Sequence, residues 1–234
     1  MYLFEKKSIV LICLFSVLFI CTIAEIFLTK KYISSFAIPI VQKTIIIDPG
    51  HGGIDAGATD NNLSEKNINL SISKELKYYL EDNGYKVILT RTEDKSTADP
   101  QRPNGTTQKK SDLDERIKAS KKGDIFISIH LNKFEIEKYK GAQVFYADNE
   151  ESKLLGETLQ DSLLQLDETN NRKAKNAKDT IYILKKAKKP AVLVECGFLS
   201  NKSEAKLLKT HEYQKEIAKA LYDGIKKYIE KEAE

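Results

Sequence analysis

The stretch Thr44–Gly57, TIIIDPGHGGIDAG, runs from an apolar segment into a glycine-rich turn and decides the fold. Its apolar residues Ile45–Ile47 predict a buried strand, and the glycines around His51 permit backbone angles that other residues resist, so the imidazole can project from the strand end. A single turn histidine of this kind is more typical of a hydrogen-bonded structural residue than of a metal ligand. Three residues at the starts or ends of later predicted elements reverse that balance: Glu65, His130 and Glu195.

The segment after the turn predicts a strand–helix–strand unit. Ser64 is a candidate cap for a helix that begins at Glu65, carries apolar residues at helical spacing and ends at Asn83-Gly84. Residues 85–91, YKVILTR, then predict a strand. A strand, a helix and a strand in this order indicate a parallel pair with a right-handed crossover.

The rest of the chain continues the alternation. Asp112 and Glu115 form a capping-box pattern for a helix that ends near Gly123, and Asn201 with Glu204 forms another. The remaining expected elements are strands at 124–130, 141–146, 181–184 and 191–194, a helix with leucines from Leu155 to Leu166, and a closing amphipathic helix from Tyr213 to Tyr228. We therefore predict an α/β fold, a single domain with a twisted, mostly parallel mixed sheet and helices on both faces.

Length and the first residues define the domain organisation. A chain of 234 residues with 41% hydrophobic residues accommodates one α/β core after a short leader. Lys6 and Lys7 precede an apolar run, Ile9–Ala24, which is typical of an export signal or membrane anchor, with the cleaved and anchored forms both open. We assign 1–30 to this leader, 31–42 to a linker and 43–230 to the α/β domain, and expect membrane contact only through the N-terminal segment.

Cysteine and charge usage exclude some classes of protein. Cys13 and Cys21 lie in the leader, so the exported body holds only Cys196, expected as a small core residue and unable to form an internal disulfide. The net charge of +4 and the basic stretch 172–189 suit a solvated face or anionic wall polymer. No nucleic-acid partner is expected, since the stretch lacks interleaved aromatic residues and no nucleic-acid fold pattern is present. The polar insertion at 93–111 predicts a mobile loop, which could be a lid over a site, a partner-binding flap or a plain surface insertion.

The candidate site residues converge because the carboxyl ends of parallel strands gather at one sheet edge. His51, His130 and Glu195 are expected at such ends, and Glu65 opens the first helix. Two neutral imidazoles and one carboxylate form a common catalytic zinc shell with a fourth position open. Glu195 follows the apolar AVLV directly, so it needs either an ion pair or a role beside the metal, where it could take a proton from water.

Four motifs carry a family resemblance: IIIDPGHGGIDAG, LSEKNINL, SIHLN and VECGFLSN, in that order. They resemble the motifs of the zinc-dependent N-acetylmuramoyl-L-alanine amidases of bacterial cell walls, and most resemble the sporulation-specific CwlD type that prepares spore-cortex peptidoglycan. The resemblance implies that His51, Glu65 and His130 bind zinc (Zn2+) and that Glu195 is the catalytic carboxylate. Its implied substrate is peptidoglycan, its implied location is outside the cytoplasmic membrane between the forespore membranes, and an accessory lipoprotein activator is a possible partner.

Two other classes of function stay open on the residues alone. A zinc peptidase acting on other peptides would use the same ligand types, although the further histidine, His211, is expected in an exposed structural role on the closing helix. A non-catalytic wall-binding protein could keep the fold, but it would be marked by a lost ligand, and all four site residues are present.

Overall fold

The computed structural model describes residues 15–25, 43–60 and 63–232. The chain divides into two units, Met1–Gln42 and Lys43–Glu234. In the first unit, residues 15–25 are helical, and no helix among the described residues is long and apolar enough to span a membrane. Residues 1–14 and 26–30 of the expected leader and all of the expected linker, 31–42, lie outside the described residues.

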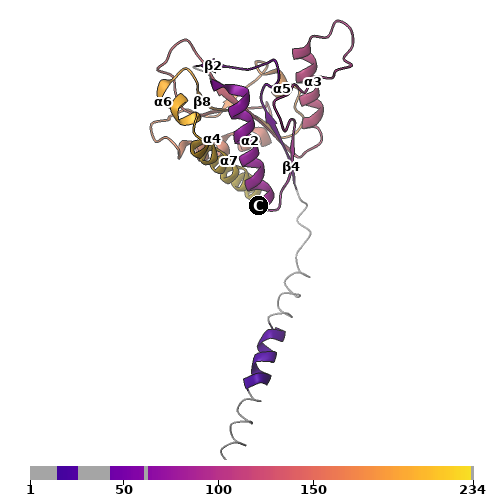
Figure 1. Ribbon diagram of the computed structural model, residues 1–234, viewed down its shortest axis with the longest axis vertical. Helices are drawn as coiled ribbons and strands as arrows, with labels where there is room; N and C mark the ends of the chain where they lie inside the picture. Colours follow the sequence, from indigo (N-terminus) through magenta and orange to yellow (C-terminus); the bar gives the residue numbers. More distant parts are fainter. Residues whose placement is uncertain (1–14, 26–42, 61–62, 233–234) are drawn as a thin grey trace, which may run out of the picture. The chain divides into compact units, whose positions relative to one another are not determined.

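The second unit alternates strands and helices in the order expected of an α/β domain (Figure 1). Its elements are β1 (Thr44–Pro49), β2 (Thr59–Asp60), β3 (Leu63–Ser64), α2 (Glu65–Asp82), β4 (Lys86–Leu89), α3 (Gln108–Ser120), β5 (Ile125–Asn132), β6 (Gln143–Tyr146), α4 (Glu150–Leu164), β7 (Lys175–Asn176), α5 (Tyr182–Lys185), β8 (Ala191–Phe198), α6 (Lys202–Leu208) and α7 (His211–Glu232).

Six of the strands form one mixed sheet in the order β4-β1-β5-β8-β6-β7. Only the β6–β8 pair is antiparallel, and the other pairs of this sheet are parallel. Side chains alternate between the two faces: Ile45 and Ile47 enter the larger core, whereas Ile46 enters the smaller one. The predicted fold class is confirmed, including the parallel pairing of β1 with β4.

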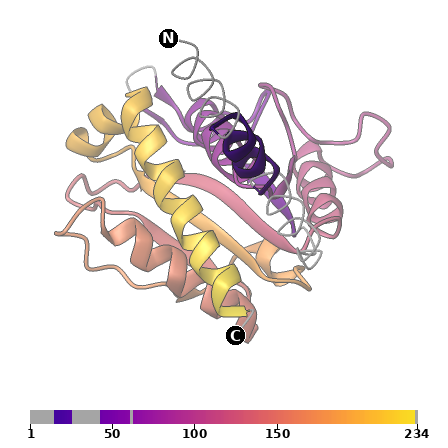
Figure 2. The ribbon, with the colours of Figure 1, turned by 90° about the horizontal axis from the view of Figure 1, so that it is seen from below.

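Helices cover both faces of the sheet. Figure 2 shows α7 crossing one face with α2 and α4 on either side of it. Helix α7 packs against both of these helices, and α2 and α4 pack against the strands. The other face carries α3 and the short α5, which contact each other. Cys196 is buried in the larger core, as predicted for a small core residue.

Three local predictions are wrong. The segment 181–184 is not a strand, because its apolar side chains Ile183 and Leu184 are buried through the one-turn helix α5. Helix α3 begins four residues before Asp112 and is capped by the hydroxyl of Thr107, so the end of the polar insertion is helical. Ser64 does precede α2, but its hydroxyl donates to the Ala56 carbonyl instead of capping the helix.

Candidate metal centre

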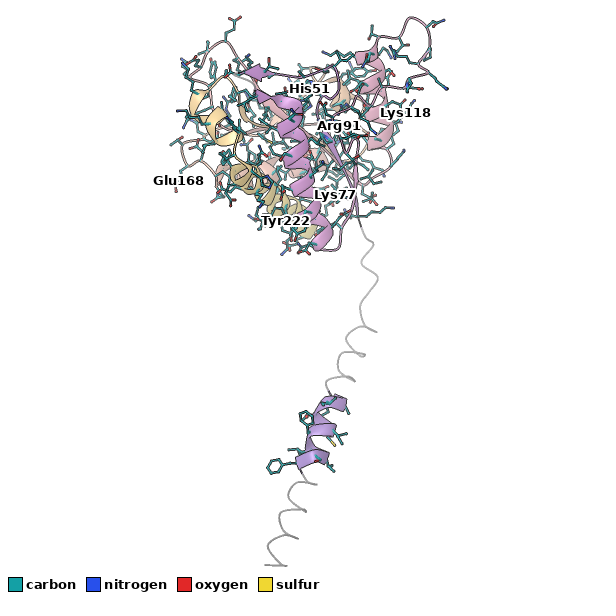
Figure 3. The ribbon with its side chains drawn as sticks, in the orientation of Figure 1. His51, Lys77, Arg91, Lys118, Glu168 and Tyr222 are labelled. Carbon is teal, nitrogen blue, oxygen red and sulfur yellow. The ribbon has the colours of Figure 1, made fainter. Side chains whose placement is uncertain are left out.

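His51, Glu65 and His130 meet at the edge of the sheet where β1 and β5 end. His51 lies two residues beyond β1, Glu65 is the first residue of α2, and His130 lies near the end of β5. The Glu65 Oε1 atom is 3.2 Å from His51 Nε2 and 2.9 Å from His130 Nδ1. One potential ligand atom from each residue lies within 4.8 Å of the others. Figure 3 shows the labelled His51 at this edge, beside the start of α2.

Two buried arginines hold the turn that carries His51. Arg116 donates to the carbonyl oxygens of Pro49, at 2.9 Å, and of His51, at 2.7 Å. Arg91 donates to those of Pro49 and Gly50, both at 3.0 Å. His51 has a φ of 60°, a left-handed conformation that costs free energy in a residue other than glycine. The two guanidinium groups therefore stabilise a strained turn at the point where a ligand is presented.

A buried carboxylate balances one of these arginines. Asp48, which is 1% exposed, forms an ion pair with Arg116 and accepts hydrogen bonds from the hydroxyls of Thr90 and Ser128. Burial by itself would raise the pKa of Asp48, but Arg116 and the two hydroxyls hold that pKa below its ordinary value. The carboxylate is therefore ionised at neutral pH and anchors Arg116 beneath the metal centre.

Glu65 is held as an ionised acceptor. Its carboxylate accepts hydrogen bonds from the backbone N–H groups of Ala58, at 2.7 Å, and Leu131, at 3.0 Å. Burial opposes ionisation, yet the neighbouring His130 and His51 lower the pKa of Glu65 far below its ordinary value. Both contacts from the backbone fix the orientation of the carboxylate toward the two imidazoles.

Close packing fixes the two imidazoles. Asp55 Oδ2 lies 2.9 Å from His51 Nδ1, which orients this ring and leaves Nε2 facing Glu65. A Cβ atom on Gly50 would lie 2.3 Å from the ring of His130, so only glycine permits this approach. The two rings meet edge to face with centroids 4.9 Å apart.

The three donors fit a zinc ion. Zinc bonds of about 2.0–2.1 Å in a tetrahedral site place ligand atoms about 3.3 Å apart, close to the 3.2 Å and 2.9 Å that separate Glu65 Oε1 from the two imidazole nitrogens. Two imidazoles and one carboxylate also match the donor preference of zinc in catalytic sites. Among the residues from Lys43 to Glu232 that the structure describes, His211 is not part of this group, and its half-exposed ring lies near Glu75 on α2.

Glu195 lies beside the three donors on the neighbouring strand β8, which continues to Phe198, so Glu195 is inside the strand and not at its end as predicted. It pairs in register with His130, so both side chains leave the sheet on the same face. Its Oε2 atom is buried and has no hydrogen-bond partner in the described part of the chain. Burial raises the pKa of Glu195 to about 7, an effect that the charge of Glu65 reinforces and the two histidines oppose. A carboxyl group of this kind can both accept and donate a proton near neutral pH.

The basic stretch 172–189 makes local contacts. The Arg172 guanidinium lies 4.7 Å from the centre of the Phe198 ring, and Lys189 donates to the Gly123 carbonyl at 2.6 Å. Lys185 pairs with Asp179. Several of its charges therefore support neighbouring segments of the domain.

Sequence reasoning did not single out Asp48, Arg91 and Arg116. A signal existed for Asp48, because a carboxylate directly after three isoleucines is costly unless it is paired. Arg116 gave no such signal, since it lies in a highly charged segment that resembles an exposed helix. The sequence also gave no indication that Asp55 would contact His51.

Known proteins resemble the part of this chain that carries the site. The profile of the N-acetylmuramoyl-L-alanine amidase family, Amidase_3, matches residues 45–227. The germination-specific N-acetylmuramoyl-L-alanine amidase of Bacillus subtilis is 39% identical over 201 residues, which are 83% of this chain and 83% of that protein. The solved structure of the CwlD amidase from Clostridioides difficile in complex with the GerS lipoprotein is similar, with 46% identity and a TM-score of 0.75 over 80% of this chain and 98% of that chain. The catalytic domain of CwlV from Bacillus (Paenibacillus) polymyxa var. colistinus has 26% identity and a TM-score of 0.69 over 80% of this chain and 98% of that one.

Proposed function

Because this chain belongs to the N-acetylmuramoyl-L-alanine amidase family, we propose that it uses one zinc ion to hydrolyse the amide between the lactyl group of muramic acid and L-alanine. Family membership and the resemblance to CwlD-type amidases are confirmed by the matches over most of the chain. The chain is thus a hydrolase of the bacterial cell wall. The observation that carries the zinc mechanism is the convergence of His51, Glu65 and His130 beside Glu195.

His51, Glu65 and His130 would hold the zinc ion. Zinc in such a site supplies a Lewis acid for the amide carbonyl and acidifies water at neutral pH. Asp55 orients His51 through the 2.9 Å contact with Nδ1, which leaves Nε2 free to bind. The hydrogen bonds of Arg91 and Arg116 to the turn keep this ligand in place.

Glu195 would move the proton. Its carboxylate accepts a proton from the attacking water and returns it to the L-alanine nitrogen, which must be protonated before it departs. A pKa near 7 lets one group perform both steps at neutral pH. The unpartnered Oε2 atom is the acceptor that this role requires.

The biological setting that we propose is spore germination. Similarity to the germination-specific amidase of Bacillus subtilis supports this role. In the finer form of the proposal, the enzyme strips peptides from cortex peptidoglycan, and a second enzyme converts the exposed muramic acid to muramic-δ-lactam. The enzyme would act outside the cytoplasmic membrane, between the forespore membranes, and its N-terminal segment would serve as export signal or anchor.

An accessory lipoprotein is the protein partner that we propose. The related CwlD amidase from Clostridioides difficile was solved in complex with the GerS lipoprotein. By analogy, a lipoprotein would bind this chain and favour its active form. Comparing the activity of the purified enzyme with and without a co-expressed lipoprotein tests this, and equal activity at full zinc occupancy would contradict it.

The decisive experiment incubates the purified protein with peptidoglycan, with and without a zinc chelator. Chelator-sensitive release of intact stem peptides that begin with L-alanine supports the amidase mechanism. Release of D-alanine or single amino acids would indicate a zinc peptidase instead, and the absence of any product would indicate a wall-binding protein. The Glu195→Gln variant is the matched control, because it keeps the ligands and removes the proton acceptor.

A further inference from the structure

A cavity of about 500 Å³ opens beside the metal centre on the α3 and α5 face of the sheet. His51 and His130 are among its lining residues, so a substrate bound at the metal centre can extend into it. Figure 1 shows α3 and α5 next to each other. The volume lies within the range of about 300–1,000 Å³ that is typical of small-ligand sites. Its floor is formed by Asp48, Ser128 and Leu193.

The cavity lining is mostly apolar and carries one unpaired cation. Leu113 of α3 and Ile181 and Ile183 at α5 supply apolar walls. Lys109, in the first turn of α3, lines the same cavity and is exposed. Within the described residues, its ammonium group has no hydrogen bond or ion pair. A cation in this position is available to a negatively charged ligand.

The carboxylates of the cavity already have partners. Asp48 and Asp112 both pair with Arg116, and Asp55 contacts His51. Among the described residues of the cavity lining, Lys109 is therefore the charged group that is left to pair with a ligand. A positive charge in a cavity that His51 and His130 also line favours a ligand that carries a carboxylate.

The substrate has two arms that differ in shape and charge. The glycan continues on both sides of each muramic acid, whereas the peptide leaves the cleaved amide in one direction. That peptide begins with a small apolar residue, L-alanine, and its second residue, D-glutamate, carries a free carboxylate when it is not amidated. The cavity has a floor, two helical walls and an unpaired cation. It therefore suits the peptide arm better than the glycan, which is a continuous polymer.

We propose that the cavity between α3 and α5 binds the peptide arm of the substrate and that Lys109 pairs with the carboxylate of its second residue. The proposal rests on the amidase function proposed above and assigns the specificity of that site. Lys109 has one competing role, because its charge also acts on Asp55. If Lys109 acted only through Asp55 and His51, it would change the cleavage of all substrates equally.

The test compares two muramoyl-tripeptide substrates that differ only in whether the carboxyl group of the second residue is free or amidated. The wild-type enzyme should have a kcat/KM roughly tenfold higher for the free acid, as expected for a charge-assisted hydrogen bond. Lys109→Met should abolish this preference, and Lys109→Arg should keep most of it. The matched control is Lys110→Met, since Lys110 pairs with Asp114 at 2.7 Å and does not line the cavity.

A binding measurement separates this proposal from the catalytic one. The Glu195→Gln protein should bind the free tripeptide acid more tightly than its amide, and adding Lys109→Met should remove the difference. Equal effects of Lys109→Met on both substrates, or no wild-type preference, would overturn the role of Lys109. If Lys109-dependent binding occurs but the wild type cleaves neither substrate, the proposed reaction fails while the cavity assignment stands.

Discussion

Replacing Arg116 with methionine should destabilise the domain and loosen the turn that carries His51. The change removes hydrogen bonds to two carboxylates, Asp48 and Asp112, and to two backbone carbonyls of the turn. Of its partners among the described residues, the buried Asp48 carboxylate would keep the hydroxyl donors of Thr90 and Ser128. Leaving one partner of a buried ion pair uncompensated typically costs about 3–5 kcal/mol, and we expect a loss of that size at pH 7.

Urea unfolding followed by circular dichroism at pH 7 and pH 5 measures this loss. In the wild type, the lowered pKa of Asp48 means that the ion pair stabilises the fold above the unfolded-state pKa, and that this stability is lost as pH falls through the folded-state pKa. Without Arg116, burial raises the pKa of Asp48, so the penalty should be smaller at pH 5 than at pH 7. The double variant Asp48→Asn/Arg116→Met should recover at least about 1 kcal/mol at pH 7, because no buried charge is left unpaired.

A neighbouring residue on the same helix provides the control. Lys118 is labelled at the edge of the domain in Figure 3, and its 63% exposed side chain pairs with Glu115. Lys118→Met should change the free energy of unfolding by less than about 0.5 kcal/mol. Zinc affinity, measured by chelator competition, should fall in Arg116→Met and stay unchanged in Lys118→Met. A cost below about 1 kcal/mol for Arg116→Met, or no recovery in the double variant, would refute the reasoning.

Further changes test the metal centre itself. His51→Ala and His130→Ala should each lower zinc content and peptidoglycan cleavage, because two protein ligands hold the metal weakly; full zinc occupancy, measured by elemental analysis, would contradict the assignment. Glu195→Gln should keep zinc while kcat falls by roughly 10²- to 10⁴-fold, the range of general-base loss, and near-normal turnover would exclude the role. In the metal-free protein, the pKa of Glu195 is raised in the folded state, so its contribution to stability should be fully present at pH values below its unfolded-state pKa and lost as pH rises through about 7. Unfolding of metal-free Glu195→Gln should lack that pH dependence. Gly50→Ala should displace the His130 ring, since the new Cβ would lie 2.3 Å from it, and lower stability by about 1–3 kcal/mol; unchanged zinc affinity would show that the ring tolerates the contact.

The sequence predicted the alternation of strands and helices because periodicity reports which faces are buried. The isoleucines of β1 and the spaced apolar residues of α2 needed no tertiary information. The segment 181–184 was mispredicted because its β-branched and aromatic residues favour a strand, whereas packing on the smaller core allows one helical turn. Local propensity and tertiary packing conflict there, and packing decides.

The placement of the site was only partly predictable. His51, Glu65 and His130 meet as expected from the ends of their elements, and their zinc role stays a prediction. The partnership of Asp48 with Arg116 joins residues 68 positions apart, and no local pattern reports such a pair. The orientation of Arg91 toward the Pro49 and Gly50 carbonyls depends equally on three-dimensional packing.

The in-register pairing of His130 with Glu195 limits which insertions and deletions the chain can tolerate. Side chains along a strand alternate between the two faces of the sheet. Inserting one residue before Glu195 within β8 would therefore turn its carboxylate away from His130 and toward the α2, α4 and α7 layer. An insertion in the segment between β4 and α3 changes no strand register. Length variation among active relatives should therefore concentrate in that segment and be absent between Ala191 and Glu195.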